Sequence, residues 1–412
     1  MINKYLATCD SCKQKFIFRA VVPLATTDSL RFSCPECESE LWANLTLDYS
    51  VPKMDLAPQG FILDDLLQEY DLPIITVATD LPVHKVKHVL SLPEGGSPFL
   101  WMHHKMGAAF PIWKEKVDSL QSLRHGYLHD IRRLLDYCRI SRWDNVRKCI
   151  EESFKDLIPL NDEFSFSEPI KSIHLCYRII SCIYTPLVLP EKMLEFLDEY
   201  YAFLNDCINT KDNQYKNLIG NCRENPEYQA FRSKILGAFL RVLAHFDAFI
   251  VGLLYEDMPP SLQKRIDEYR IFRDDYLVIK ALYQDIFELT SQLTVFLGAI
   301  INLSIRNDPC HFSNGDRSFN KFKKRPAFQR LQILSEAPRL NTLLSAVSRP
   351  MRNTIGHFSA DYDCRSGDLQ YDDGININYI VFLGQFFTAV KALWFMLIFV
   401  EKMDIDWHRY LE

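Results

Sequence analysis

The sequence predicts a mainly α-helical protein that carries a small β module at its N-terminus. Three observations predict this fold class. β-favouring runs surround two pairs of cysteines in the first fifty residues, and apolar residues recur at three- and four-residue steps from about residue 113 onward. The composition, 48% hydrophobic and 24% charged in 412 residues, is that of a globular protein. A chain of this length is expected to form two or three domains.

Residues 1–50 are predicted to form a zinc ribbon. Cys9 and Cys12 make one CxxC pair and Cys34 and Cys37 another, a spacing at which two short turns present four thiolates to one tetrahedral ion. Zinc with four sulfur ligands has no open position for water, so we expect a structural site. Five basic residues stand against six acidic ones in this segment. The partner of the ribbon therefore stays open between a regulatory protein and a nucleic-acid trigger.

Residues 51–190 are interpreted as a connecting region, irregular at first and then helical. Seven prolines interrupt short apolar runs up to about residue 112, where the helical pattern begins. Residues 191–412 are predicted to form a helical domain. Within and just before that domain the apolar pattern predicts helices at roughly 190–208, 226–256, 260–304, 326–349 and 376–403.

Charge and cysteine usage indicate a cytoplasmic protein. A net charge of -6 argues against indiscriminate nucleic-acid binding, so any RNA must be bound by local positive charge. The cysteines outside the two pairs lack a disulfide framework, and the N-terminus lacks a secretory pattern. Residues 379–400 are long enough to cross a bilayer, but Gln385 and Lys391 interrupt them. We therefore expect a buried core helix and no membrane.

The segment MRNTIGHF, residues 351–358, combines an arginine, an asparagine and a histidine with a nearby proline and glycine. On an unbroken helix Arg352 and His357 would point about 140° apart, and the proline and glycine permit a bend toward one cleft. Cleavage of RNA by its own 2'-hydroxyl needs a base, an acid and a cation beside the phosphorane. His357 can transfer protons, Arg352 can stabilise the phosphorane, and Asn353 can orient either side chain.

This chemistry also predicts an oligomer. One histidine cannot serve as base and acid in the same displacement, and a second copy of the segment would complete the set. Two-fold symmetry brings identical surfaces together. We therefore expect a homodimer in which two copies of the segment share one groove.

The stretch RNTIGH resembles the R-polar-x-x-x-H motif of the HEPN superfamily, all-α proteins that include many ribonucleases. Arg352 and His357 match the two defining positions and Asn353 the polar one. The resemblance covers the motif and, by helical context, residues 226–412. It implies a helical bundle, an endoribonuclease that needs no metal for catalysis, dimerisation through the motif face, and a role in prokaryotic antiviral defence (abortive infection) or as a regulated toxin. The alternative is a non-catalytic zinc-ribbon adaptor or RNA-binding scaffold.

A basic segment upstream, DRSFNKFKKRPAFQR, has the strongest local positive charge in the chain, with Phe319 and Phe322 interleaved. Such a segment can hold a phosphate backbone and stack bases, although a run of charge is more often a solvated connector. The candidate RNA-binding residues, which include one arginine beside the motif, are Arg317, Lys321, Lys323, Lys324, Arg325 and Arg349.

Two further stretches are weaker candidates for a functional site. RHGYLH, with Arg124 and His129, also fits the motif and could form the second half of an intramolecular pair, but its helix has no proline break, so a solvated helix face is favoured. DYDCRSGDLQYDDG gathers aspartates that could bind magnesium. Turn chemistry explains aspartate and glycine there more simply, so no metal is assigned to it.

Overall fold

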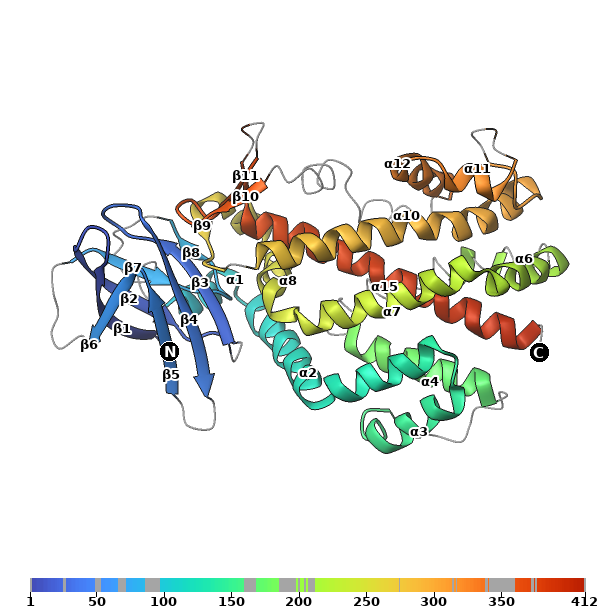
Figure 1. Ribbon diagram of the computed structural model, residues 1–412, viewed down its shortest axis with the longest axis horizontal. Coiled ribbons are helices and arrows are strands. Elements are labelled where there is room, and N and C mark those ends of the chain that lie inside the picture. The colour runs from blue at the N-terminus through green and yellow to red at the C-terminus, as the bar shows by residue number, and fades with distance from the viewer. Residues whose placement is uncertain are drawn as a thin grey trace. The chain divides into compact units, whose positions relative to one another are not determined.

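The computed structural model is mainly α, as predicted, with β strands at the N-terminus (Figure 1). It divides into two compact units, each built from three separate stretches of sequence. Unit 1 comprises Met1–Glu115, His245–Ala281 and Asn353–Phe387, and unit 2 comprises Lys116–Ala244, Leu282–Arg352 and Thr388–Glu412. The structure describes residues 2–24, 27–48, 53–65, 72–85, 97–158, 168–184, 198, 201–203, 205–206, 212–273, 275–312, 315, 317–337, 340, 360–371, 374 and 376–410.

The N-terminal part of unit 1 is a pair of sheets. One sheet has four strands in the order β6-β1-β2-β7, in which β7 runs parallel to β2 and the other pairs are antiparallel. The other is antiparallel, in the order β3-β4-β5. The strands are β1 (Ile2–Cys9), β2 (Lys15–Val21), β3 (Thr27–Ser33), β4 (Glu40–Asp48), β5 (Lys53–Gln59), β6 (Phe61–Asp65) and β7 (Ile74–Val77).

The two sheets pack their apolar faces together. Every second residue of β4 is buried, which is the two-residue period of a strand with one face on a core. Phe18 of β2 stacks on Phe32 of β3 with ring centroids 5.2 Å apart, and Phe61 of β6 meets Phe32 edge-on at 5.4 Å. These rings belong to one buried cluster that joins both sheets. The β module is therefore a sandwich with an aromatic centre.

The strands continue beyond the predicted boundary at residue 50. β5 pairs with β4 over its whole length, so the residues on either side of that boundary belong to one sheet. β6 and β7 add two more strands, in the connecting region that the sequence predicts to be mixed. Prolines are tolerated here because β5 and β7 each lie at the edge of a sheet.

A segment from the middle of the chain completes the β module. β9 (Tyr269–Arg270) pairs with β8 (Val83–His84), and Phe272 enters the core of the sandwich, its N–H donating to the carbonyl of Ala78 at 3.0 Å. Arg273 is buried among three carboxylates. Its guanidinium contacts Asp28 at 3.1 Å, Asp80 at 3.2 Å and Asp275 at 2.6 Å.

Unit 1 also contains a three-stranded antiparallel sheet, with strands β10 (Ala360–Asp363), β11 (Asp368–Tyr371) and β12 (Asn376–Asn378). In the turn between β10 and β11, Gly367 has a φ of 74° and its N–H donates to the carbonyl of Asp363 at 2.8 Å. The Asp363 carboxylate accepts from the N–H of Arg365 at 2.9 Å. Turn chemistry thus accounts for these aspartate and glycine positions, as the sequence indicated.

Helices of unit 1 pack closely through a glycine. Gly252 lies in α8 (Ile250–Asp257), where a Cβ atom would come within 2.4 Å of the carbonyl oxygen of Leu383 in α15 (Tyr379–Tyr410). Only a residue without a side chain permits this contact. The other helices that begin in this unit are α1 (Pro98–Met106), α2 (Ala109–Arg139), α9 (Pro260–Gln263) and α10 (Tyr276–Arg306).

Unit 2 is helical in its described residues. Its remaining helices are α3 (Trp143–Ser153), α4 (Glu168–Tyr184), α6 (Asp212–Glu224), α7 (Pro226–Ala244), α11 (Phe319–Lys323) and α12 (Ala327–Leu331). A buried ion pair crosses its core: Nε of Arg232 in α7 donates to the Asp404 carboxylate of α15 at 2.7 Å. A second guanidinium nitrogen of Arg232 donates to the carbonyl of Arg139 at 3.2 Å. This arginine thereby connects α2, α7 and α15.

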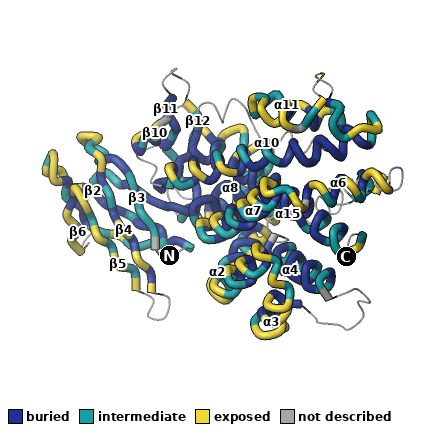
Figure 2. Tube along the Cα trace, turned by 45° about the vertical axis from the view of Figure 1, so that its right-hand side comes forward, coloured by how far each residue is buried: buried dark blue, intermediate teal, exposed yellow. Residues whose placement is uncertain are grey.

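Among the residues that the structure describes, two helices are long and apolar enough to cross a membrane, α10 and α15, and the bent pair formed by α7 and residues 246–257 would be a third candidate. The sequence drew attention to α15 alone. In the folded chain 89% of the most apolar window of α10 and 78% of that of α15 are buried, and Figure 2 shows α10 mostly in dark blue. This burial agrees with their interpretation as core helices.

Candidate functional site

The four paired cysteines lie at the ends of two β hairpins. Cys9 ends β1 and Cys34 follows β3, so each CxxC turn connects two antiparallel strands. The two hairpins close in the same register, since Thr8 pairs with Lys15 directly below one turn and Ser33 with Glu40 below the other. The sequence reflects this similarity, because an apolar residue stands seven positions after each first cysteine: Phe16 after Cys9 and Leu41 after Cys34. Sequence reasoning overlooked it.

The backbone of the two turns is also the same. In each, the N–H of the first cysteine donates to the carbonyl five residues later, at 3.0 and 2.8 Å. The carbonyl of that cysteine accepts from the N–H four residues later, at 2.9 and 3.1 Å. The residues at that fourth position, Lys13 and Glu38, have φ values of 61° and 59°. Left-handed conformations are uncommon for residues with side chains, so both turns hold the same demanding geometry.

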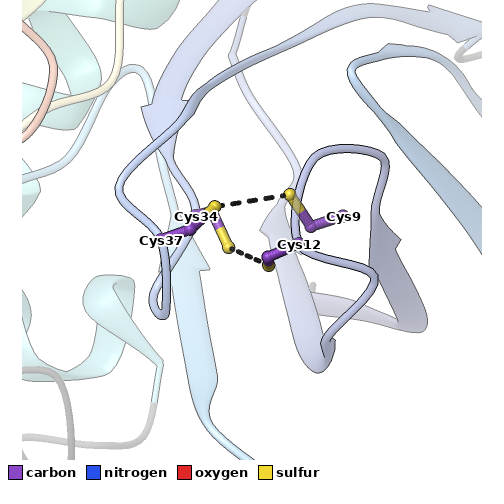
Figure 3. A group of neighbouring side chains, drawn as sticks. All are labelled: Cys9, Cys12, Cys34 and Cys37. Carbon is purple, nitrogen blue, oxygen red and sulfur yellow. Dashed lines mark hydrogen bonds between the residues drawn. The ribbon is translucent and has the colours of Figure 1, made fainter.

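The sulfur atoms converge on one point between the turns (Figure 3). Cys9 and Cys37 are 3.8 Å apart at Sγ, as are Cys12 and Cys34, and all four sulfurs lie within 4.8 Å of one another. Four sulfurs about 2.3 Å from a central ion form a tetrahedron whose edges are about 3.8 Å. The donor set and its spacing are compatible with a structural zinc site.

The environment of the thiols differs between the two ends of the cluster. Burial raises the pKa of Cys34 to about 12. Hydrogen bonds from the hydroxyl and the backbone of Ser39 lower the pKa of Cys37 to about 6. A divalent cation bound by all four sulfurs would hold each as a thiolate, whatever its pKa without metal, because a coordinating thiol is deprotonated outright.

The predicted catalytic residues Arg352, Asn353 and His357 lie outside the described residues, and so does Arg349. The basic segment is described in most of its length. Arg317, Lys321, Lys323 and Lys324 are exposed, and Arg325 is half-buried.

Two contacts fix the basic segment against unit 2. Lys323 forms an ion pair with Glu227 in the first turn of α7. Phe322 is buried and stacks on Phe312 with ring centroids 3.9 Å apart. The ring of Phe322 is therefore packed within the protein, and it is not available for the base stacking that the sequence allowed as one possibility.

The second motif match lies on an unbroken helix. Arg124 and His129 both belong to α2, which runs without a break from residue 109 to residue 139. His129 is exposed and Arg124 half-buried. Five residues along a regular helix turn the two side chains about 140° apart. This placement agrees with the favoured reading of a solvated helix face.

Comparison with known proteins found no matching family model, no matching curated protein and no matching solved structure.

Proposed function

We propose that this protein is a metal-independent endoribonuclease of the HEPN type whose N-terminal β module is held together by a structural zinc ion. The observation that carries the catalytic part is the R-N-x-x-x-H pattern of residues 352–357 in a mainly α chain. The observation that supports zinc is the convergence of four sulfurs within 4.8 Å.

Each proposed role follows from side-chain chemistry. His357 takes the proton of the ribose 2'-hydroxyl, or returns one to the leaving 5'-oxygen, since an imidazole titrates near neutral pH. Arg352 stays protonated and stabilises the charge that develops on the phosphorane oxygens. Asn353 orients these groups by hydrogen bonds. The second histidine that one displacement requires comes from a second copy of the chain, so the active form is a dimer.

The zinc ion acts on the fold and not on the reaction. With four sulfur ligands it retains no position for water or substrate. It joins the β1–β2 hairpin of one sheet to the β3–β4 hairpin of the other. Zinc binds small zinc-dependent domains with an apparent free energy of about 10–16 kcal/mol, and this binding energy stabilises the folded state. We therefore expect the β module to unfold when the ion is lost.

The test of catalysis uses the purified full-length chain, RNA, and EDTA in excess, with the zinc content of the protein measured again after the incubation. We expect products with 2',3'-cyclic phosphate ends that disappear in His357→Ala. The matched control is His129→Ala, which removes an exposed histidine from α2. RNA left intact by the wild-type protein, with equal RNA affinity in both variants, would contradict the nuclease and favour the adaptor.

The test of the zinc site compares two cysteine substitutions by metal analysis. Cys34→Ser removes one of the converging sulfurs and should abolish the zinc content of the purified protein. Cys182→Ser changes a half-buried cysteine of α4 that lies outside the cluster, and it should leave one zinc ion per chain. Equal zinc content in the two variants would refute the assignment.

A further inference from the structure

A polar groove lies between α7 and α10 in unit 2, beside the end of α2. Its volume is about 430 Å³, and ligand sites commonly range from about 300 to 1,000 Å³. Ser233, Lys234 and Gly237 of α7 line one side, and Gln292 of α10 lines the other. Arg139, the last residue of α2, also lines the groove. Polar side chains predominate in it, so it suits a polar or charged ligand.

Gly237, inside α7, is not explained by close packing against a neighbouring helix. Glycine inside a helix is destabilising relative to alanine, so an interior glycine calls for a reason. At Gly252 the reason is contact with a neighbouring helix, since a Cβ atom there would lie 2.4 Å from a backbone oxygen. A Cβ atom at Gly237 would meet nothing within 4 Å. Because Gly237 lines the groove, a side chain at this position would extend into open space beside it.

The charges in the groove leave a positive surplus. Arg241 pairs with Asp285 at 2.7 Å. Arg139 pairs with Asp136 at 3.3 Å. Three basic side chains line the groove against two acidic ones, Asp285 and Glu288. Lys234 is exposed and has no partner among the residues that the structure describes, so it is the group that can attract an anion.

Arg139 is held in place to act with that lysine. Its Nε donates to the Ser233 hydroxyl at 2.9 Å, and one terminal nitrogen contacts Asp136 at 3.3 Å. Holding a guanidinium before the ligand arrives reduces the entropy lost on binding. Guanidinium and ammonium groups form strong, charge-assisted hydrogen bonds with phosphate oxygens.

We propose that this groove binds a phosphodiester segment of RNA, with Lys234 and Arg139 contacting the phosphate oxygens. The inference rests on the proposed function, in which RNA is the substrate. The basic segment contacts one of the helices that form the groove, since Lys323 pairs with Glu227 in the first turn of α7. The exposed lysines of α11 are therefore additional candidates for contacts to the same RNA.

The test measures binding without cleavage. A fluorescent single-stranded RNA with 2'-O-methyl riboses lacks the attacking hydroxyl, so its affinity is independent of the proposed reaction. Lys234→Glu should weaken binding about tenfold or more, because it replaces a charge-assisted contact with repulsion. Substitution of Lys234 by Gln should also reduce the slope of log affinity against log salt by about 0.7, the value for one phosphate contact on a single strand.

Two further variants make the test specific. Gly237→Trp fills the groove without removing a charge and should also weaken RNA binding, provided that its thermal unfolding midpoint matches the wild type. If Gly237→Trp fails to fold, Lys234→Glu decides alone. Lys148→Glu makes the same charge reversal on the exposed surface of α3 and should leave the affinity unchanged apart from a small screened effect.

The outcomes separate this inference from the nuclease proposal. Equal RNA affinity in wild type, Lys234→Glu and Lys148→Glu would overturn the groove as an RNA site, even if unmodified RNA is cleaved. Weaker binding in Lys234→Glu, with unchanged binding in Lys148→Glu, would support the groove even if unmodified RNA stays intact. Adenosine monophosphate bound in the groove, with RNA affinity unchanged in both groove variants, would assign the groove to a small nucleotide and would also overturn the RNA inference.

Discussion

The buried carboxylates around Arg273 predict an unusual dependence of stability on pH. Asp28 faces Arg273, Asp80 and the hydroxyl of Thr79, and its side chain is only 2% exposed. Burial raises the pKa of Asp28 from 3.8 to about 7, and the positive charge of Arg273 offsets only part of that effect. Burial raises the pKa of Asp80 as well. One guanidinium does not neutralise the three carboxylates around it, so Asp28 keeps its proton to a higher pH than an exposed aspartate does.

The sign and size of the effect follow from linkage. The folded state binds the proton of Asp28 more tightly than the unfolded state, so this contribution is fully present below about pH 3.8 and is lost as the pH rises through about 7. A tenfold change in proton affinity corresponds to about 1.4 kcal/mol. The rise in the pKa of Asp28 from 3.8 to about 7 therefore adds about 4 kcal/mol to the free energy of unfolding when the group is fully protonated in both states. Between about pH 8 and pH 5.5 the gain in stability expected from Asp28 is about 2 kcal/mol.

The assay is denaturant unfolding of wild type and Asp28→Asn across that pH range. Asparagine keeps the size of the side chain and cannot ionise. The wild type should gain about 2 kcal/mol relative to Asp28→Asn as the pH falls from about 8 to 5.5. Asp64→Asn, at an exposed position of β6, is the control and should run parallel to the wild type. Parallel curves for wild type and Asp28→Asn would show that Asp28 has no raised pKa in the folded protein, and so would a wild type that loses stability on acidification relative to that variant.

Three further substitutions test the packing of the two units by their denaturation midpoints. Gly252→Ala should destabilise unit 1 by about 1–3 kcal/mol, because the new methyl group meets the carbonyl of Leu383, and an unchanged midpoint would show that the helices can separate freely. Asp404→Asn should cost about 3–5 kcal/mol in unit 2, since the guanidinium of Arg232 stays buried without its counter-charge. Gly367→Ala should cost about 1–3 kcal/mol because φ there is 74° and the new methyl group would clash with the Cβ of Arg270, and an unchanged midpoint would contradict this expectation.

Local features of the fold could be predicted from the sequence. Helices α10 and α15 could be predicted because apolar residues recur along them with helical spacing. The helix predicted to begin near residue 260 was wrong in its first part, where α9 and β9 precede α10. The convergence of Cys9 with Cys37 followed from the CxxC spacing, since ligand chemistry constrains the geometry. The turn at Gly367 followed from its residue types, because glycine adopts a positive φ at little cost.

Contacts between distant segments could not be predicted in this way. β7 pairs with β2 in parallel, and Phe272 inserts into a core built by the N-terminal strands. The apolar pattern of a short strand specifies which face is buried, and it does not specify the partner. The groove at Gly237 was equally hidden, because an isolated glycine in a helical pattern indicates weak helix propensity and not an open space. The position of His357 lies outside the described residues, so its role remains a prediction.

The discontinuity of unit 1 bears on how the protein is made. The N-terminal strands leave the ribosome early, but Phe272 and the strands from Ala360 to Asn378 follow only after most of the chain has been translated. Until then the growing polypeptide carries a nascent sandwich with part of its interior uncovered, a condition that invites aggregation. Zinc captured by Cys9, Cys12, Cys34 and Cys37 needs only the first stretch of sequence. Early binding of the proposed zinc ion would therefore stabilise the nascent chain until its later segments are synthesised.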